Sequence, residues 1–375
     1  MVTRPLVLDS LEIHRFRVFR HLQIDRLKQV NLIVGKNNVG KTCLLEALLL
    51  YANRGSLLTM RMVLESRDEA KRLLTSSEGD AKGRSIRYLF HGRGDLEDQH
   101  EPVQIGPIGS PPDMLSIGLI WFRQQLDQHG RQQWQRIPPE DYDAGGLLLP
   151  GLNIALGAQP VLSYPLHIDI PDLDRVVQLK KPRQIPSIFV PANCLGREQV
   201  NLLWDKIALT DLERDVLASL HIIASEVERV NLVGSQEGDR ERIPMAKITD
   251  FDDPLPLRSL GEGMNRLFGV VLALVNARDG MLLIDEIDSG LHYSVQPDLW
   301  RLIFQVARRL NVQVFATTHS WDCVQAFQQA AQKNGQGDGL LISLRERKDQ
   351  KGQAVAVLFD ERELGIATRE QIEVR

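Results

Sequence analysis

Short, mainly apolar runs recur along the chain and are typical of strands that are buried on both faces of a sheet. They are VNLIV at 30–34, SIFVPA at 187–192, MLLI at 281–284 and the apolar part of NVQVFATTHS at 311–320. Two of them are followed by segments with helical character, at 42–52 and at 321–333. Strands that alternate with helices predict an α/β fold with a parallel sheet flanked by helices.

The segment 56–190 has a different pattern, in which polar and turn-rich pieces separate short strand-like runs such as LSIGLIWF at 115–122. This pattern predicts antiparallel strands and loops of a first lobe. Trp121 and Trp134 lie here and are interpreted as packing residues rather than platforms for stacked bases. Near the end of the chain, LLISLRER and AVAVLFD flank a polar KDQKGQ turn, which predicts a strand pair.

A regular apolar stripe predicts a helix in the segment 193–245, which we expect to be a helical insertion before a last lobe at 246–345. Thr210 and Glu213 have the spacing of a capping box. The stripe recurs at threes and fours and consists of Leu209, Leu212, Val216, Leu220, Ile223, Val227 and Val230. Packing within the chain, a short arm and a dimerisation helix all remain open for it.

Composition narrows the class of protein. With 375 residues and 43% apolar content the chain has material for a large core, and we expect one domain over 1–375. The formal charge of −4 excludes a protein coated in basic residues, although HRFRVFRH at 14–21 forms a local basic cluster. Cys43, Cys194 and Cys323 lie far apart, so neither a disulfide framework nor a zinc cluster is predicted. No apolar run of about 18 residues is present, and a soluble, cytoplasmic protein is expected.

The motif GKNNVGKT at 35–42 directly follows a predicted strand and precedes a predicted helix. Gly35 and Gly40 permit a turn whose backbone N–H groups surround a phosphate, and Lys41 adds a positive charge. Thr42 supplies a hydroxyl for Mg²⁺, and the helix dipole favours the same anion. An accidental glycine turn is the alternative, which the strand and helix on either side disfavour.

The motif GMLLIDEID at 280–288 places two adjacent carboxylates at the end of a buried strand. Strand alternation directs them to opposite sides, so that Asp285 approaches Mg²⁺ and Glu286 polarises a water molecule. Two acids that merely end a strand are the alternative. The presence of a phosphate loop in the same chain favours the catalytic interpretation.

Two further segments, SLGEG and TTHS, complete the set of candidate nucleotide-binding motifs. In LRSLGEGMNRLF, Ser259, Gly261 and Gly263 precede an apolar helix and form a second anion-binding helix start. Because the first loop already holds phosphates, we expect the second to cover a nucleotide that another copy carries.

In TTHS, a neutral His319 can hydrogen-bond the γ phosphate or the attacking water. An ordinary histidine at the end of a strand is the alternative.

The order GKNNVGKT, SLGEG, LLIDEID with SGLH, then TTHS resembles the ABC-type ATPase head of RecF-type and structural-maintenance-of-chromosomes (SMC) proteins. More closely it is similar to the bacterial AAA15/AAA21-type proteins related to the overcoming-lysogenization-defect (OLD) family. The resemblance implies an ABC-type P-loop fold, with a mixed-sheet lobe beside a parallel sheet, that binds ATP and Mg²⁺. It implies that Glu286 and His319 are catalytic, that Thr42 and Asp285 hold the metal, and that the D-loop is Asp288 to Leu291. The nucleotide-binding residues that it implies are Gly35, Asn37, Asn38, Val39, Gly40, Lys41, Thr42, Cys43, Ser259, Gly261 and Glu262.

Two departures from the family pattern matter. SLGEG stands where transporters carry LSGGQ, which disfavours a transporter. The glutamine loop has no clear counterpart, and Gln104 and Gln184 are the candidates. The 55 or so residues after His319 leave no room for a TOPRIM nuclease domain, so we expect any nuclease to be a separate effector.

These inferences predict an ATP-hydrolysing switch that pairs head to tail as a homodimer or higher oligomer, without a membrane partner. Control of a separate effector in phage defence is what the resemblance implies. A DNA-repair ATPase that acts on DNA through a basic groove near 14–28, and a nucleotide-gated scaffold with little turnover, are the alternatives.

Overall fold

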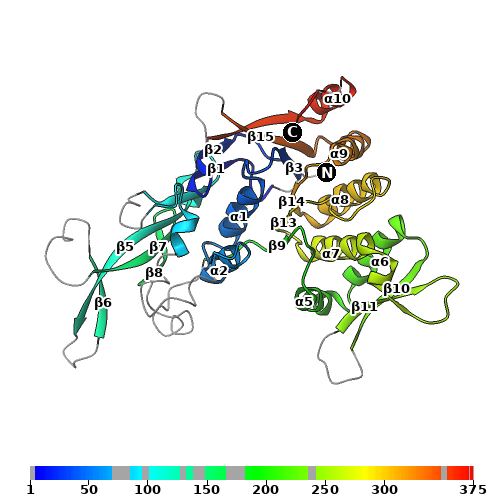
Figure 1. The fold of residues 1–375 in the computed structure, drawn as a ribbon, viewed down its shortest axis with the longest axis horizontal. Helices are drawn as coiled ribbons and strands as arrows, with labels where there is room; N and C mark the ends of the chain where they lie inside the picture. The colour runs from blue at the N-terminus through cyan, green and yellow to red at the C-terminus, as the bar shows by residue number, and fades with distance from the viewer. Residues whose placement is uncertain are drawn as a thin grey trace.

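A computed structural model of the protein describes residues 5–69, 85–94, 101–126, 132–137, 148–165, 182–234, 242–347, 353–370 and 372–374. Within these ranges the strands form sheets of seven, six and three strands. In Figure 1 the parallel sheet and its helices occupy the centre and right, strands β5 to β8 of the antiparallel sheet extend to the left, and the small sheet lies at the lower right with α5 and α6. The sequence prediction of an α/β ABC-type head agrees with this arrangement.

The six-stranded sheet is the parallel sheet that the apolar runs predicted. Its order is β16-β15-β3-β14-β13-β9, and every neighbouring pair is parallel except β15 with β16. Its strands are β3 (Val30–Gly35), β9 (Ser187–Val190), β13 (Met281–Ile284), β14 (Gln313–Thr317), β15 (Gly339–Glu346) and β16 (Ala354–Asp360). All residues of β3, β13 and β14 are buried, because helices cover both faces of the sheet.

The seven-stranded sheet is antiparallel and has the order β2-β1-β4-β5-β7-β8, with β6 paired to β5. Its strands are β1 (Leu11–Phe16), β2 (Phe19–Ile24), β4 (Val103–Gly106), β5 (Leu115–Leu126), β6 (Gln132–Ile137), β7 (Leu148–Leu156) and β8 (Gln159–Pro165). Leu11 and Ile13 on β1 are fully buried and alternate with the partly exposed Glu12 and His14. This sheet therefore has one apolar face and one polar face.

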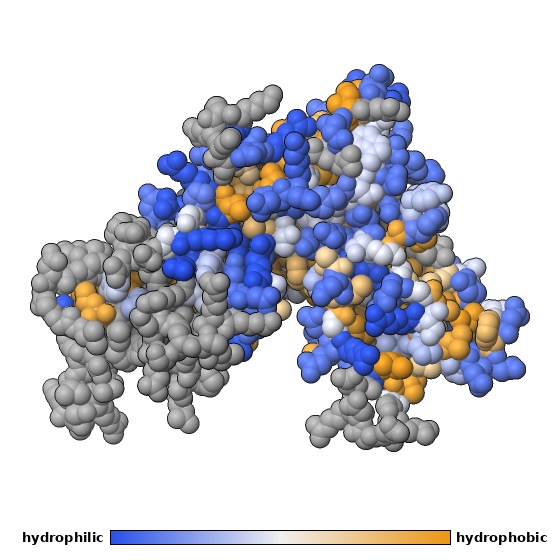
Figure 2. Space-filling view, in the orientation of Figure 1, coloured by the Kyte–Doolittle hydropathy of each residue, from blue (hydrophilic) through white to orange (hydrophobic). Residues whose placement is uncertain are grey.

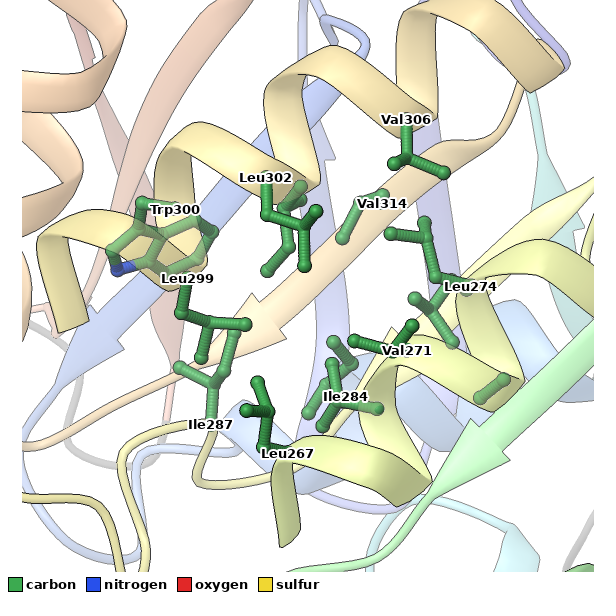
Figure 3. Close-up of a cluster of buried hydrophobic side chains, with 14 of the residues drawn as sticks. Leu267, Val271, Leu274, Ile284, Ile287, Leu299, Trp300, Leu302, Val306 and Val314 are labelled. Atoms are coloured by element: carbon green, nitrogen blue, oxygen red, sulfur yellow. The ribbon is translucent and has the colours of Figure 1, made fainter. Parts of the chain in front are cut away.

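Helix α1 (Lys41–Ala52) lies between the two large sheets. Its apolar residues share a core with Ile13 of the antiparallel sheet and with Ile33 and Leu283 of the parallel sheet. Eleven of its twelve residues are buried, which explains a sequence that is apolar on every side. The opposite face of the parallel sheet is covered by α7 (Glu262–Asn276), α8 (Gln296–Leu310) and α9 (Trp321–Asn334), and Figure 3 shows this second core.

The remaining elements lie around these layers. The helices are α2 (Leu57–Glu65), α5 (Arg197–Ile207), α6 (Asp211–Ile223) and α10 (Glu361–Arg369). The small antiparallel sheet consists of β10 (Val227–Gly234), β11 (Arg242–Ile248) and β12 (Leu255–Pro256). Short 3₁₀ turns lie at Arg87–Leu89, Pro111–Asp113 and Leu257–Leu260.

The apolar stripe that predicted one helix over 209–230 divides between a helix and a strand. Leu209 is 99% exposed and precedes the helix, because Thr210 is the N-cap and accepts the N–H of Leu212. Val227 and Val230 are buried on β10. A register shift between Val227 and Arg229 lets residues three apart face the same side of a strand, which imitates helical spacing.

The segment 193–245, which we predicted to be helical, contains α5 and α6 and continues as β10 and the start of β11. The segment is therefore mixed rather than helical. The strand pair near the end of the chain is confirmed, since β15 and β16 pair antiparallel from Leu340 with Asp360 to Glu346 with Ala354.

The three cysteines, Cys43, Cys194 and Cys323, are free thiols in the structure. Among the helices of the described ranges, none is both long and apolar enough to span a membrane. The visible face in Figure 2 is mostly hydrophilic, with small, separate hydrophobic patches.

Candidate nucleotide-binding site

The loop 35–42 joins the end of β3 to the start of α1 and requires glycine at two positions. Gly35 has φ +150° and Gly40 has φ +108°. A Cβ atom at Gly35 would lie 2.5 Å from the carbonyl oxygen of Leu344, and one at Gly40 would lie 2.7 Å from the ring of Phe19. Both positions combine a backbone conformation that favours glycine with a lack of space. The loop shape is thus fixed by the strand and the hairpin on either side.

Lys41 is buried although it carries a charge. Its side chain is 6% exposed, and its Nζ donates to the carbonyl oxygens of Gly35 at 2.8 Å and Lys36 at 2.9 Å. Burial is the largest influence on the pKa of Lys41 and lowers it, against the attraction of Asp285 and Glu286. A bound anion would supply the charge that these neutral carbonyls do not supply.

Asp285 follows directly after β13 and is held by two threonine hydroxyls. Thr42 Oγ1 donates to Asp285 Oδ2 at 3.0 Å, and Thr317 Oγ1 donates to Asp285 Oδ1 at 2.6 Å. Asp285 follows β13, Thr317 is the last residue of β14, and Thr42 lies in the first turn of α1, just after the loop that follows β3. The three strands are parallel neighbours, so these residues meet at the same edge of the sheet. The structure therefore brings the predicted metal ligands Thr42 and Asp285 together, and adds Thr317, which the sequence did not single out.

Glu286 is exposed and has φ +47°, an uncommon value for a residue other than glycine. Its N–H donates to Thr317 Oγ1 at 2.8 Å. Strand alternation was the wrong reason for its direction, because β13 ends at Ile284 and a turn, rather than a strand, positions the carboxylate. Strained backbone of this kind is frequently found at functional sites.

His319 lies in the loop between β14 and α9 and is partly buried. Burial, followed by the positive charge of Lys41, lowers the pKa of His319, although Glu286, Asp288 and Asp285 oppose the shift. The imidazole is therefore neutral at neutral pH. The preceding residue, Thr318, donates to Asp288 Oδ1 at 2.5 Å and ties this loop to the predicted D-loop.

Arg266 on α7 is a site residue that sequence reasoning missed. It is 1% exposed, and its guanidinium donates to the carbonyl oxygens of Asp285 at 2.6 Å, Glu286 at 3.1 Å and Pro191. The available signal was a single arginine within an otherwise apolar helix. Through this residue the helix that follows SLGEG supports the backbone of both site carboxylates.

The SLGEG segment forms a separate, open surface. Ser259, Gly261 and Glu262 are exposed, and no heavy atom lies within 4 Å of the position of a Cβ on Gly261. Helix α7 begins at Glu262 without a side-chain cap, which leaves N–H groups available. Gly263 passes close to the D-loop, since its Cβ would lie 2.8 Å from the carbonyl oxygen of Gly290. Between described residues, no hydrogen bond or ion pair joins 258–263 to the loop 35–43.

The other residues of the first loop lie as follows. Lys36, Asn37 and Asn38 are exposed and Val39 is half-buried. Cys43 is buried in the first turn of α1, and burial raises the pKa of its thiol. Only the backbone of Cys43 is thus suited to contact a phosphate.

Neither glutamine candidate lies beside the site. Gln184 donates to the carbonyl oxygen of Asn53 at 3.4 Å, at the end of α1 opposite to the loop. Gln104 is on β4 and lines a pocket with Glu12 and His14. The turn nearest to Asp285 on this side follows β9, since the Asp285 N–H donates to the carbonyl oxygen of Val190 at 2.9 Å. This turn carries the exposed Asn193 in place of a glutamine.

The cluster HRFRVFRH is only partly exposed. Arg17 is 2% exposed and forms ion pairs with Glu46 at 2.7 Å and Glu69 at 3.0 Å. His14 and His21 both contact Glu12. Arg17 is therefore not accessible to DNA, whereas Arg20 is exposed.

The residues present fit a triphosphate and a divalent cation. Lys41 is a buried cation with neutral acceptors, the start of α1 has no side-chain cap, and two threonine hydroxyls and a carboxylate converge on one point. Hydroxyl and carboxylate oxygens are the protein ligands that Mg²⁺ prefers.

Comparison with known proteins agrees with this geometry. Residues 7–83 match the family model AAA_15, "AAA ATPase domain", and residues 210–322 match AAA_21, "AAA domain, putative AbiEii toxin, Type IV TA system". An "ATP/GTP phosphatase" of Helicobacter pylori is 22% identical over 347 residues, which cover 86% of this chain and 88% of that protein. An uncharacterized protein of Methanocaldococcus jannaschii is 38% identical over 61 residues, which are 28% of its length.

Among solved structures, an SMC head bound to the C-terminal winged-helix domain of ScpA superposes with a TM-score of 0.51 at 14% identity, over 95% of this chain and 98% of that one. At this identity the likeness concerns the fold. Fold, site geometry and family models together define the class: the chain is a P-loop ATPase whose fold is like that of an SMC head.

Proposed function

We propose that the protein is an ATP-driven switch in which two copies pair head to tail and enclose two nucleotides. Each ATP is bound by the loop 35–43 of one copy and covered by Ser259, Gly261 and Glu262 of the other. Hydrolysis then separates the copies. A two-fold symmetric pair of this kind contains two sites, because the phosphate loop of each copy faces the SLGEG surface of the other.

The observation that carries this proposal is the open SLGEG surface. An exposed helix start with glycine on either side is suited to an anion. Among the described residues, no hydrogen bond or ion pair joins Ser259 or Gly261 to the phosphate loop of their own chain. Arg266 joins this helix to the backbone of Asp285 and Glu286. A partner that binds SLGEG therefore contacts the start of α7, the helix that supports the backbone of Asp285 and Glu286.

The chemistry follows from the positions of the side chains. Lys41 and the loop N–H groups bind the phosphates. Mg²⁺ held by Thr42 and Asp285 would neutralise charge on the phosphate oxygens. Glu286 accepts a proton from the attacking water, and neutral His319 donates a hydrogen bond to the γ phosphate or to that water. Thr317 holds both carboxylate-bearing residues in place.

Mixing two inactive variants tests the shared sites. Lys41→Ala removes the loop cation, and Ser259→Arg blocks the covering surface. In a mixed pair, one site combines both defects and the other is intact. A 1:1 mixture should recover about a quarter of the wild-type ATPase rate, since about half of the pairs are mixed and each has one working site.

The control is a mixture of Lys41→Ala with a Lys41→Ala, Ser259→Arg double variant, which contains no intact composite site and should stay inactive. The proposal fails if the ATPase rate recovers in neither mixture while both single variants are folded and Ser259→Arg still binds ATP. That result would show that each copy hydrolyses ATP alone. Light scattering with and without ATP checks the pairing directly.

We further propose that the switch controls a separate effector in phage defence and acts in the cytoplasm. The family description that matches 210–322 names a putative toxin of a toxin–antitoxin system, which supports a role in such a system. A direct role on DNA has less support, because Arg17 is buried and paired. Co-purification with the product of a neighbouring gene in the presence of ATP, and its loss in Ser259→Arg, is the corresponding test.

A further inference from the structure

A second constellation of polar side chains lies on the antiparallel sheet, on the face away from α1. Glu12 and His14 alternate with the buried Leu11 and Ile13 on β1, and His21 lies opposite His14 on β2. Because side chains two apart on a strand and directly opposite on its neighbour share one face, the three residues form one cluster. The core on the other face separates this cluster from α1 and its phosphate loop.

The ligand atoms of this cluster already lie at coordination spacing. Glu12 Oε1 lies 3.1 Å from His14 Nε2 and 2.8 Å from His21 Nε2, and the three atoms lie within 4.8 Å of one another. Ligands at about 2.0–2.1 Å from a tetrahedral zinc ion are about 3.3 Å apart. Two imidazole nitrogens and one carboxylate oxygen are a frequent protein contribution to a zinc site with an open fourth position.

The strands bring these side chains next to one another before any ion binds. The rings of His14 and His21 stack with centroids 4.2 Å apart and an angle of 10° between their planes, and a rotation of one ring about its side-chain torsions directs both nitrogens to one ion. Gln23 Nε2 donates to Glu12 Oε1 at 2.8 Å and orients the carboxylate. A carboxylate oxygen facing two imidazole nitrogens is a ligand set that a zinc-like cation can bind.

The cluster also borders a pocket of about 830 Å³. Glu12 and His14 line it, and the remaining lining comes from β4, β5, the turn at 156–159 and the segment 109–114. Gln104, Ser116 and Gln159 contribute polar groups to this wall. A metal held by the cluster would therefore have space for a water molecule or a small ligand beside it.

We propose that Glu12, His14 and His21 form a binding site for a zinc-like divalent transition-metal ion, with its fourth position open to the adjacent pocket. The site is separate from the nucleotide site and does not depend on the proposed pairing of heads. Oxygen-preferring Mg²⁺ would not occupy it, since two of the three ligands are imidazole nitrogens.

Titration of the untagged full chain with Co²⁺ tests the proposal, because tetrahedral Co²⁺ absorbs visible light and replaces Zn²⁺ in nitrogen and oxygen sites. We expect one equivalent to bind, and Zn²⁺ to displace it. His14→Ala, His21→Ala and Glu12→Gln should each weaken binding about tenfold or more. His221→Ala, which removes an exposed histidine on α6, is the matched control and should leave binding unchanged.

Thermal unfolding and ATP binding, measured on each variant, verify that it is folded. Zn²⁺ should raise the melting temperature of the wild type and of His221→Ala, but not that of His14→Ala or His21→Ala. Folded cluster variants that bind Co²⁺ as tightly as the wild type would overturn the proposal. So would a wild type that shows no cobalt absorption and no stabilisation by Zn²⁺.

Discussion

The hydroxyl of Thr317 lies 2.6 Å from Asp285 Oδ1 and also accepts the N–H of Glu286 at 2.8 Å. One side chain at the end of β14 thus positions both residues that follow β13. Thr317→Val keeps the shape and removes both hydrogen bonds. Supporting groups of this kind typically affect metal affinity or activity about 10–100-fold, and we expect a loss of that size in kcat, with a raised Mg²⁺ requirement.

Magnesium titration of the steady-state ATPase rate measures this effect. Thr249→Val is the matched control, because Thr249 is exposed and its hydroxyl contacts only the carbonyl oxygen of Glu226 in the described contacts. If Thr317→Val had the kcat and the Mg²⁺ dependence of the wild type, Thr317 would have no role in turnover or metal binding.

The pKa of His319 should depend on Lys41. Burial and the Lys41 charge lower this pKa below the ordinary value of 6.5. Lys41→Met removes one of the two causes, so the pKa of His319 should rise, and NMR titration of the nucleotide-free protein measures it. Lys206→Met, at an exposed position of α5, should leave it unchanged. An unchanged pKa of His319 in Lys41→Met would show that the charge of Lys41 does not act on His319.

The lowered pKa of His319 also determines the direction in which the stability of the protein changes with pH. Below 6.5 the unfolded chain binds a proton at His319 more readily than the folded chain does. The contribution of His319 to stability is therefore fully present above pH 6.5 and is lost as the pH falls through 6.5 towards the lower pKa of the folded state. Urea unfolding of the wild type and His319→Gln from pH 7.5 to 5.5 should show a difference that changes in this direction.

Arg266→Leu should destabilise the protein and lower its activity together. The substitution leaves the carbonyl oxygens of Asp285, Glu286 and Pro191 without this donor, and one unsatisfied buried acceptor costs about 1–3 kcal/mol. Denaturant unfolding measures the loss. Arg278→Leu, at an exposed position after α7, should cost less than about 0.5 kcal/mol.

Glu286→Gln should stop turnover and leave ATP binding intact. The substitution preserves size and polarity while it removes the proton acceptor. We expect an ATP-dependent pair that persists for hours, detected by light scattering, and a kcat reduced at least about a hundredfold. A cellular function that survives in this variant would favour the nucleotide-gated scaffold over the turnover-dependent switch.

Much of the site follows from local sequence. Gly35, Gly40, Lys41 and Thr42 carry the phosphate loop within eight residues, and MLLI followed by two acids locates the second motif. These patterns sufficed because strand periodicity and the steric freedom of glycine act over a few residues. The same locality explains why β13 and the start of α1 were predicted to within a residue.

Only the tertiary structure decided which distant groups meet. It buried Arg17 against Glu46 rather than exposing it to DNA, placed Arg266 under the two carboxylates, and brought His14 to His21 across a hairpin. It also ended the helix before Val227, where a bulged strand imitates helical spacing. Local sequence determines the conformation of a short segment, whereas burial and pairing depend on which segments the fold brings together, and that information is spread over the whole chain.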